Sequence, residues 1–514
     1  MYHFAISLLF ILIGILAVNL TKFLAHRRSV QHLLRRVPGP KASSLLWGEE
    51  WLLYHTEPGS QYVEWHQKYG KVVKFTGALG HQAISIIDPR AISFILGEGT
   101  YHFPKPHGVR EWFKATLGQG ILWVEGKVQH ERHRRALSPA LSKQAVRKFT
   151  PLFYETSMKM AAQWGKVLDL AERDEVEIEV TSWAGRFALD TVIRTAFSYD
   201  FNFLSGEHES LLDALDGLTN NENKLSSFYM RALFWIFPSI LSIGKKGEMV
   251  RQSKRELGDI ALKMWKDAKV AGDVDGKNLM ALMLKADSDA GGKRMTEEEI
   301  VAQMRTTISA GYETVSALVA WILYELSTHQ DVQTRLREEI VAFGRDELTA
   351  DELSSLPFLE ATMKETLRMH PPILENHHEA TETITVPLSE PLPGTSESHL
   401  IIPKDTLIAI PVNVIHMDES IHGSDANVFR PERWLEKQKE GIRHDREIFA
   451  FSEGPRVCIG KEFALTEIKA LLTVLLRQYS FSCNRDIEPF QSFVIRPRIK
   501  GQGPSSLPLL VRKL

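Results

Sequence analysis

The segment that most constrains this chain lies near its C-terminus, where residues 451–460 read F-S-E-G-P-R-V-C-I-G. It holds Cys458, one of only two cysteines in the chain, together with Gly454, Arg456 and Gly460. An apolar pattern with helical spacing follows directly. We therefore expect Cys458 at or just before a helix N-terminus, where unpaired backbone N–H groups and the helix dipole favour a thiolate.

The residues around this thiol allow two interpretations. A free cysteine is usually a small buried hydrophobe. The spacing F-x-x-G-x-R-x-C-x-G favours a ligand site instead, because a chance match to five fixed residue types is on the order of one in several thousand for a chain of this length. Gly454 and Gly460 would let the backbone approach a flat ligand, and Arg456 would place a permanent cation near an anion.

Phe451, Gly454, Arg456, Cys458 and Gly460 together resemble the haem-binding loop of the cytochrome P-450 family, the haem-thiolate monooxygenases. The resemblance implies that Cys458 is the axial ligand of the iron of haem b. It also implies that Arg456 pairs with a haem propionate.

The N-terminus has a different character. Residues 4–21 carry no charge and are almost entirely apolar, and Lys22, Arg27 and Arg28 follow at once. This length is just enough for a helix to cross a bilayer, and the charge asymmetry places the main body in the cytosol. A cleaved secretory signal is the alternative, but it would carry its positive charge before the apolar run. The predicted organisation is a transmembrane anchor at 1–25, a basic and Pro/Gly hinge at 26–45, and one domain at 46–514.

Composition excludes several classes of protein. The net charge of −2 gives no field that would attract nucleic acid, and two cysteines cannot form a disulfide framework. The patterning predicts a mainly α fold with a small β-rich lobe. Short strands are expected at 71–75 and 83–87, a mixed loop at 104–126, a largely helical region at 143–290, and a strand soon after residue 373.

A basic helix is expected around residues 130–135, with His130 and Arg134 on one face. A solvated basic face is the ordinary interpretation. The same spacing resembles the helix of the family that binds the haem propionates, which would give both residues that role.

Thr296 and Glu299 form a capping box that opens a helix running to about residue 328. Its middle reads A-G-Y-E-T over residues 310–314, where Gly and Thr are poor helix formers. A solvated Glu313 and a back-bonded Thr314 are the ordinary interpretation. The pattern resembles the oxygen-activation motif of the family, in which Ala310 lies against the haem and the acid–alcohol pair, Glu313 and Thr314, supplies protons.

Glu365 and Arg368 are three residues apart on a predicted helix, and Arg433 lies in the later segment F-R-P-E-R-W. They resemble the E-x-x-R motif of the family and its partner arginine, a structural network behind the haem. His378 stands where many members have a propionate-binding arginine, which makes the propionate contacts of this chain less like those of the family.

Taken together, the resemblance implies a monooxygenase that inserts one atom of O2 into a lipophilic, terpenoid-like small molecule of secondary metabolism. Electrons would come from NADPH through a separate reductase, and the protein would be a single-pass protein of the endoplasmic reticulum with its catalytic domain on the cytosolic side. An isomerase or dehydratase of the same fold acting on peroxides, and a non-catalytic haem-binding membrane protein, are the alternatives. Glu375 and Asn376 are the polar candidates for contact with substrate.

Overall fold

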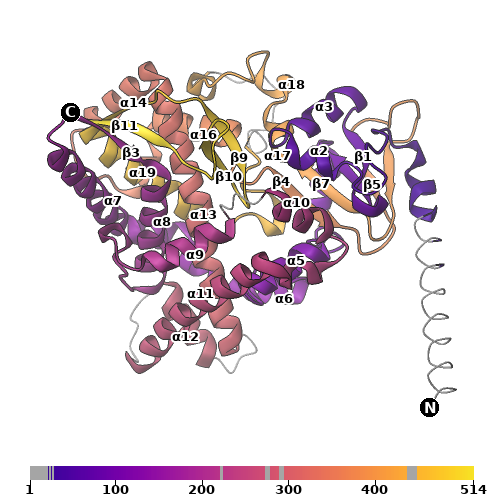
Figure 1. The fold of residues 1–514 in the computed structure, drawn as a ribbon, viewed down its shortest axis with the longest axis horizontal. Coiled ribbons are helices and arrows are strands. Elements are labelled where there is room, and N and C mark those ends of the chain that lie inside the picture. The colour runs from indigo at the N-terminus through magenta and orange to yellow at the C-terminus, as the bar shows by residue number, and fades with distance from the viewer. Residues whose placement is uncertain are drawn as a thin grey trace.

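The structure is a computed structural model that describes residues 21, 25, 28–219, 224–271, 278–288, 295–436 and 448–514. A large helical body lies beside a smaller lobe built on β-strands (Figure 1). The expected mainly α fold with a small β-rich lobe is therefore confirmed.

The helical body is organised around α13 (Glu297–Thr328), which begins at the expected capping box between Thr296 and Glu299. Helix α8 (Val180–Phe197) packs closely along it. Two glycines permit this approach: a Cβ on Gly185 would lie 2.9 Å from the ring of Tyr312, and one on Gly311 would lie 3.0 Å from Val192. Helices α7 (Lys143–Ala171) and α19 (Lys461–Gln478) pack against each other in the same large hydrophobic core.

The remaining helices surround this core or cover the β-lobe (Figure 1). The α-helices are α2 (Glu50–His55), α3 (Ser60–Tyr69), α4 (Pro89–Leu96), α5 (His107–Thr116), α6 (Lys127–Leu137), α9 (Glu209–Thr219), α10 (Lys224–Leu233), α11 (Gly244–Ala271), α12 (Leu279–Ser288), α14 (Gln330–Ala342), α15 (Ala350–Ser354), α16 (Pro357–Met369), α17 (Val412–His416) and α18 (Glu419–His422). The 3-10 helices are η1 (Leu34–Arg36), η2 (Ala78–Gly80), η3 (Ser138–Leu141), η4 (Phe203–Ser205), η5 (Pro238–Ser242), η6 (Pro431–Trp434) and η8 (Gly454–Arg456).

The β-lobe is built on a four-stranded sheet in the order β1-β2-β7-β4. Its strands are β1 (Val72–Thr76), β2 (Gln82–Ile86), β7 (Leu407–Pro411) and β4 (Glu375–Glu379), and only the β2–β7 pair is parallel. The first two strands and β4 lie where the sequence predicted strands. Three smaller sheets pair β5 (Ile384–Pro387) with β6 (His399–Ile402), β9 (Ile487–Gln491) with β10 (Ile495–Ile499), and β3 (Glu175–Glu179) with β11 (Pro508–Lys513) and β8 (Tyr479–Ser482).

The expected loop at 104–126 is wrong in part, because α5 occupies residues 107–116 and buries Phe113 against the helical body. Prolines and glycines on either side of that helix concealed its apolar face. The predicted membrane span at 4–21 lies outside the described residues except for Thr21, and no helix within the described part of the chain is long and apolar enough to cross a membrane.

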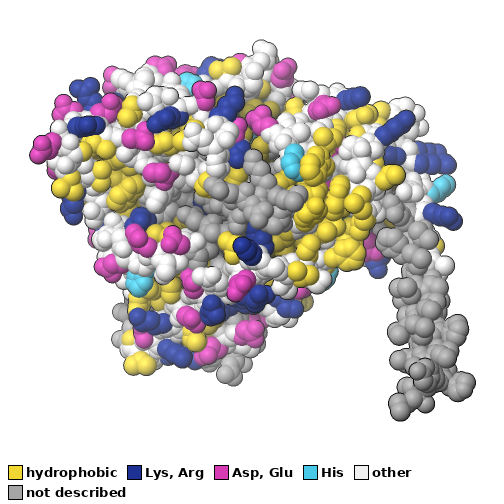
Figure 2. Space-filling model, viewed as in Figure 1, with side chains coloured by type: hydrophobic (Ala, Val, Ile, Leu, Met, Phe, Trp, Pro, Cys, Tyr) yellow, Lys and Arg dark blue, Asp and Glu magenta, His cyan; other side chains and the backbone are white. Residues whose placement is uncertain are grey.

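Hydrophobic side chains gather on one face of the molecule, over the junction of α2 and α10 (Figure 2). Phe228 of α10 is buried there among the rings of Trp47, Trp51 and Tyr54. Trp51 and Tyr229 remain more than one-third exposed. This face is therefore unusually apolar at the surface.

Candidate functional site

The loop around Cys458 joins the turn η8 to the first residue of α19, Lys461. The backbone N–H of Cys458 donates to the carbonyl of Phe451 at 2.9 Å, which closes the loop on itself. Cys458 therefore lies just before a helix N-terminus, where its position in the sequence predicted it.

The Cys458 side chain is accessible to solvent, yet protein surrounds it closely. Burial raises the pKa of its thiol, while the backbone N–H of Gly460 and the charge of Arg134 lower it. The backbone N–H groups at the start of α19 lower the pKa, as the sequence predicted, but burial outweighs them and the net direction is upward. Binding of a metal ion, which requires the thiolate, would displace this proton.

The two glycines of the loop differ in what they require. Gly454 has a φ of +72°, and a Cβ built on it would lie 2.1 Å from the carbonyl oxygen of Leu96. At Gly460 a Cβ would meet nothing within 4 Å. Gly454 is thus fixed by its backbone conformation and by α4 rather than by a ligand, and Gly460 leaves open space beside the thiol.

A cluster of charged groups lies beside the loop. Arg456 donates from Nη2 to Glu125, and Lys105 donates from Nζ to the other oxygen of the same carboxylate at 3.2 Å. The Arg456 guanidinium also lies over the ring of Tyr101, whose hydroxyl lies 3.1 Å from Nδ1 of His130. Tyr101 and Lys105 precede α5, Glu125 and His130 lie just before and within α6, and Arg456 lies in the Cys458 loop. The fold thus brings three separate parts of the chain together.

The charges of this cluster do not balance. Burial, with Arg456 and Lys105 next in effect, lowers the pKa of His130 to about 4, so this histidine is neutral near pH 7. Burial likewise lowers the pKa of Lys105 to about 8, which leaves the lysine largely protonated at neutral pH. Two cations therefore share the one carboxylate of Glu125, and the buried Nε of Arg456 has no hydrogen-bond partner among the described residues. The donor set fits a ligand that brings further carboxylates, as haem does with its two propionates.

The other two predicted propionate residues have defined partners. Arg134 donates from Nη1 to the carbonyl of Val457 at 2.8 Å, which ties α6 to the Cys458 loop. Nδ1 of His378 lies 2.8 Å from the carbonyl of Phe103, so Nδ1 carries the proton. Burial lowers the pKa of His378 to about 4. The imidazole is consequently neutral, and it does not replace the charge of an arginine.

The middle of α13 combines a buried acid with accessible neighbours. Ala310 is exposed and Thr314 is half-buried one turn later, although Ile308 and Tyr312 are buried. The Thr314 hydroxyl donates to the carbonyl of Ala310 at 2.9 Å, which leaves its oxygen able to accept a hydrogen bond. Glu313 is buried. Helix α13, which is largely buried, is therefore accessible to solvent around Ala310 and Thr314, next to the poor helix former Gly311.

Glu365, Arg368 and Arg433 meet in one buried network. Arg368 makes two hydrogen bonds to the Glu365 carboxylate at 2.8 and 2.9 Å, and Arg433 makes a third at 2.8 Å. Nε1 of Trp434 adds a further bond at 2.9 Å. The network joins α16 to η6.

Glu375, predicted as a possible substrate contact, lies in a separate buried network. Its carboxylate accepts from the Tyr62 hydroxyl at 2.8 Å and pairs with Arg231 of α10 at 3.2 Å and with His377 at 3.1 Å. Glu50 of α2 is also buried there, and burial raises its pKa to about 8 despite the opposing charge of Arg231. The carboxylate of Glu375 is thus committed to protein groups that join α10 to the β-lobe.

Sequence patterns missed Lys105, Glu125 and Tyr101. Each lies in irregular backbone outside any motif, and the one local signal was a lysine between Pro104 and Pro106. Their role depends on which segments the fold brings beside Arg456, and no single segment carries that information.

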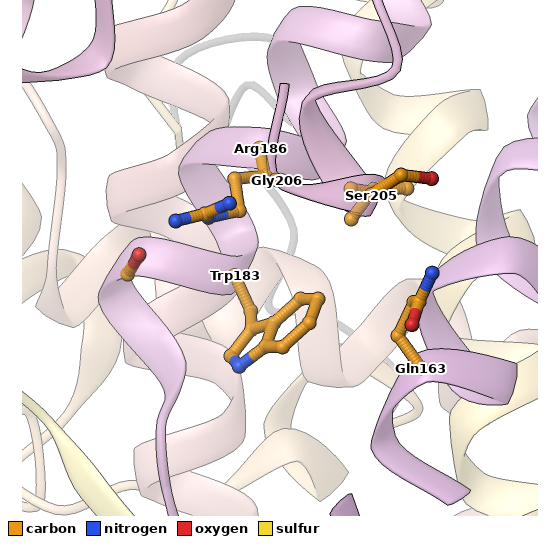
Figure 3. A pocket seen from close by; sticks show the side chains of 7 residues that line it. Gln163, Trp183, Arg186, Ser205 and Gly206 are labelled. Atoms are coloured by element: carbon orange, nitrogen blue, oxygen red, sulfur yellow. The ribbon is translucent and has the colours of Figure 1, made fainter. Parts of the chain in front are cut away.

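A surface pocket of about 270 Å³ is lined by residues of α7, α8 and η4 and by none of the Cys458 loop (Figure 3). Trp183 and Arg186 of α8 point into it from one side, and Gln163 of α7 and Ser205 of η4 line it from the other. Arg186 is already bound to the carbonyl of Phe203 and to Glu209. The pocket contains none of the predicted site residues.

Comparison with known proteins supplies the family context. The family model described as cytochrome P-450 matches residues 37–502. A cytochrome P-450 monooxygenase of Ampulloclitocybe clavipes, claQ, is 35% identical, with 93% of this chain and 92% of that protein covered. Monooxygenase 128 of Postia placenta is 30% identical over 93% of each chain, and a ganoderic acid synthetase of Ganoderma lucidum is 29% identical over 89% of each.

The two loop glycines give a matched pair of substitutions. Gly454→Ala forces a side chain into a left-handed conformation and against a backbone oxygen, so thermal denaturation should show a loss of at least about 1 kcal/mol in stability. Gly460→Ala meets open space and should unfold close to the wild type. Equal stability of the two variants would contradict the loop geometry.

Glu50 should make stability depend on pH. Its folded pKa of about 8 lies above the unfolded value of about 4.5, so stability is unaffected by this group below pH 4.5 and falls as pH rises toward 8. Glu50→Gln should remove this loss. At pH 8 the free energy of unfolding of the variant should exceed that of the wild type by about a few kcal/mol, measured by thermal denaturation. The exposed Glu57→Gln is the control. A wild type and Glu50→Gln pair with parallel pH profiles would contradict the assignment.

Proposed function

Because the chain belongs to the cytochrome P-450 family, and is thus a haem-thiolate monooxygenase, we propose that it oxidises a lipophilic small molecule with Cys458 as the thiolate ligand of the haem iron. One oxygen atom of O2 enters the substrate, and NADPH supplies electrons through a separate reductase. The observation that carries the proposal is the accessible Cys458 thiol before α19, set beside a cluster whose cations exceed its carboxylates.

The Cys458 loop provides the ligand and fixes its direction. The N–H of Cys458 is bound to the carbonyl of Phe451, and Arg134 binds the carbonyl of Val457. These two hydrogen bonds fix the backbone that carries the sulfur. When bound, haem supplies the activation of dioxygen, which an electron-rich thiolate ligand favours. The protein supplies position, protons and exclusion of water.

Arg456, Arg134 and Lys105 are the cations that would hold the haem propionates. Arg456 and Lys105 share Glu125, and a bound propionate would complete their charge balance. His378 and His130 are neutral and would serve as hydrogen-bonding neighbours rather than counter-charges. Lys105 would supply the positive charge for a propionate that an arginine at position 378 would otherwise supply.

Glu313 and Thr314 would manage the protons. The Thr314 oxygen, whose own proton is bound to the carbonyl of Ala310, can accept a hydrogen bond and hold a water molecule in place. Glu313 is the adjacent buried acid that can replace protons as they are used. The small side chain of Ala310 leaves room for a flat ligand against that turn of α13.

The proposal extends to the cellular location and the class of substrate. The apolar run at 4–21 and the basic residues after it support a single-pass anchor in the endoplasmic reticulum with the catalytic domain in the cytosol. The apolar face over α2 and α10 would lie against that membrane. A relative named for ganoderic acid synthesis supports a terpenoid-like substrate of secondary metabolism.

Cys458→Ala should abolish the far-red-shifted absorption band of the reduced carbon monoxide complex, because no thiolate would remain on the iron. Cys483→Ala removes the other cysteine and should leave the band unchanged. Persistence of the band in Cys458→Ala would exclude this residue as the ligand.

Thr314→Ala should retain haem but divert electrons from product to peroxide, lowering the yield of product per NADPH by roughly tenfold or more. Thr314→Ser keeps a hydroxyl and should restore much of the coupling. Thr328→Ala removes a similarly back-bonded hydroxyl from the end of the same helix and serves as the control. Unchanged coupling in Thr314→Ala would refute the role given to this residue.

A further inference from the structure

His416 connects the buried network of Glu365 to the chain that leads into the Cys458 loop. It is the last residue of α17 and has no exposed surface. Its Nδ1 lies 3.0 Å from the carbonyl of Arg368, and the backbone N–H of Phe449 donates to its Nε2 at 2.7 Å. Two segments far apart in the sequence thus meet at one imidazole.

The partners determine which nitrogen of His416 carries the proton. A carbonyl oxygen can only accept and a backbone N–H can only donate, so Nδ1 is protonated and Nε2 is not. Burial lowers the pKa of His416 to about 3, which agrees with a neutral ring. The imidazole therefore acts as a fixed bridge with one donor and one acceptor.

Each end of this bridge leads to a rigid structure. Nη1 of Arg368 donates to the carbonyl of His416 at 3.1 Å, so the two residues bind each other reciprocally while Glu365 holds the guanidinium. At the other end, the carbonyl of Phe449 accepts from Ser452 N–H at 2.9 Å. Ser452 has a φ of +58°, a conformation that costs a non-glycine residue about 1 kcal/mol or more and needs support.

The turn from Phe449 to Ser452 places Phe451, whose carbonyl accepts from the N–H of Cys458. A displacement of Phe449 would therefore move the acceptor that fixes the Cys458 backbone. From this geometry we propose that His416 is a positioning residue for the thiolate ligand, acting through the Phe449 N–H. The inference rests on the proposed ligation of haem iron by Cys458 and assigns a role to a residue outside the E-x-x-R network.

Three substitutions separate the two hydrogen bonds. A glutamine amide reaches about as far as Nε2 and can accept from Phe449, whereas an asparagine amide reaches about as far as Nδ1 and can donate to Arg368. His416→Phe removes both bonds at similar size. His66→Asn is the matched control, because His66 is also buried and bonded through both nitrogens, to Gly70 and Ser85 of the β-lobe.

The measurement is the rate at which the reduced carbon monoxide complex of the holoenzyme loses its far-red-shifted band in favour of the shorter-wavelength band typical of a lost thiolate. His416→Asn and His416→Phe should convert roughly tenfold faster than the wild type, the effect of about one hydrogen bond. His416→Gln and His66→Asn should convert near the wild-type rate, even where thermal unfolding shows that either is less stable.

Wild-type rates in both His416→Asn and His416→Phe would overturn the proposal. So would a His416→Gln rate as fast as that of His416→Asn, because the Phe449 bond would then not be the one that matters. A wild-type complex without the far-red-shifted band would instead overturn the ligation by Cys458, and the inference with it.

Discussion

The hydrogen bonds and ion pairs of the Glu365 carboxylate hold together the segments that support the Cys458 loop. Glu365 has no exposed surface, and a buried charge is costly unless it is paired and hydrogen-bonded. Burial alone would raise its pKa, but Arg368 with its hydrogen bonds and charge, and then Arg430 N–H and Arg433, hold the pKa below its usual value. Through these partners one anion fixes α16, the segment before η6 and, by way of Arg368 and His416, the entry to the Cys458 loop.

Beside the Cys458 loop, the cationic side chains outnumber the carboxylates. Arg456 and Lys105 converge on the single carboxylate of Glu125, and the histidines at 130 and 378 remain neutral. Haem, which brings iron and two carboxylates, matches both the thiol and the surplus cations. In the proposed haem site, Lys105 would supply the positive charge that the neutral His378 does not provide.

The sequence predicted the features that depend on residues close together in the chain, but not those that depend on the packing of distant segments. Cys458 and the capping box at Thr296 were predictable because each depends on residues close together in the chain. The helix at 107–116 was missed since prolines and glycines surround it, and the rise in the thiol pKa was missed because burial is a property of the whole fold. Lys105, Glu125 and His416 acquire their roles only from distant segments that packing brings to them.

In the proposed site, the sulfur of Cys458 is bound to iron in the folded protein. Iron K-edge X-ray absorption of the purified, haem-loaded, full-length protein tests it most directly, because the first coordination shell distinguishes sulfur from nitrogen and oxygen. If Cys458 is the ligand, this shell contains one sulfur neighbour besides the haem nitrogens. A first shell containing only nitrogen and oxygen in the correctly folded protein would contradict this ligation.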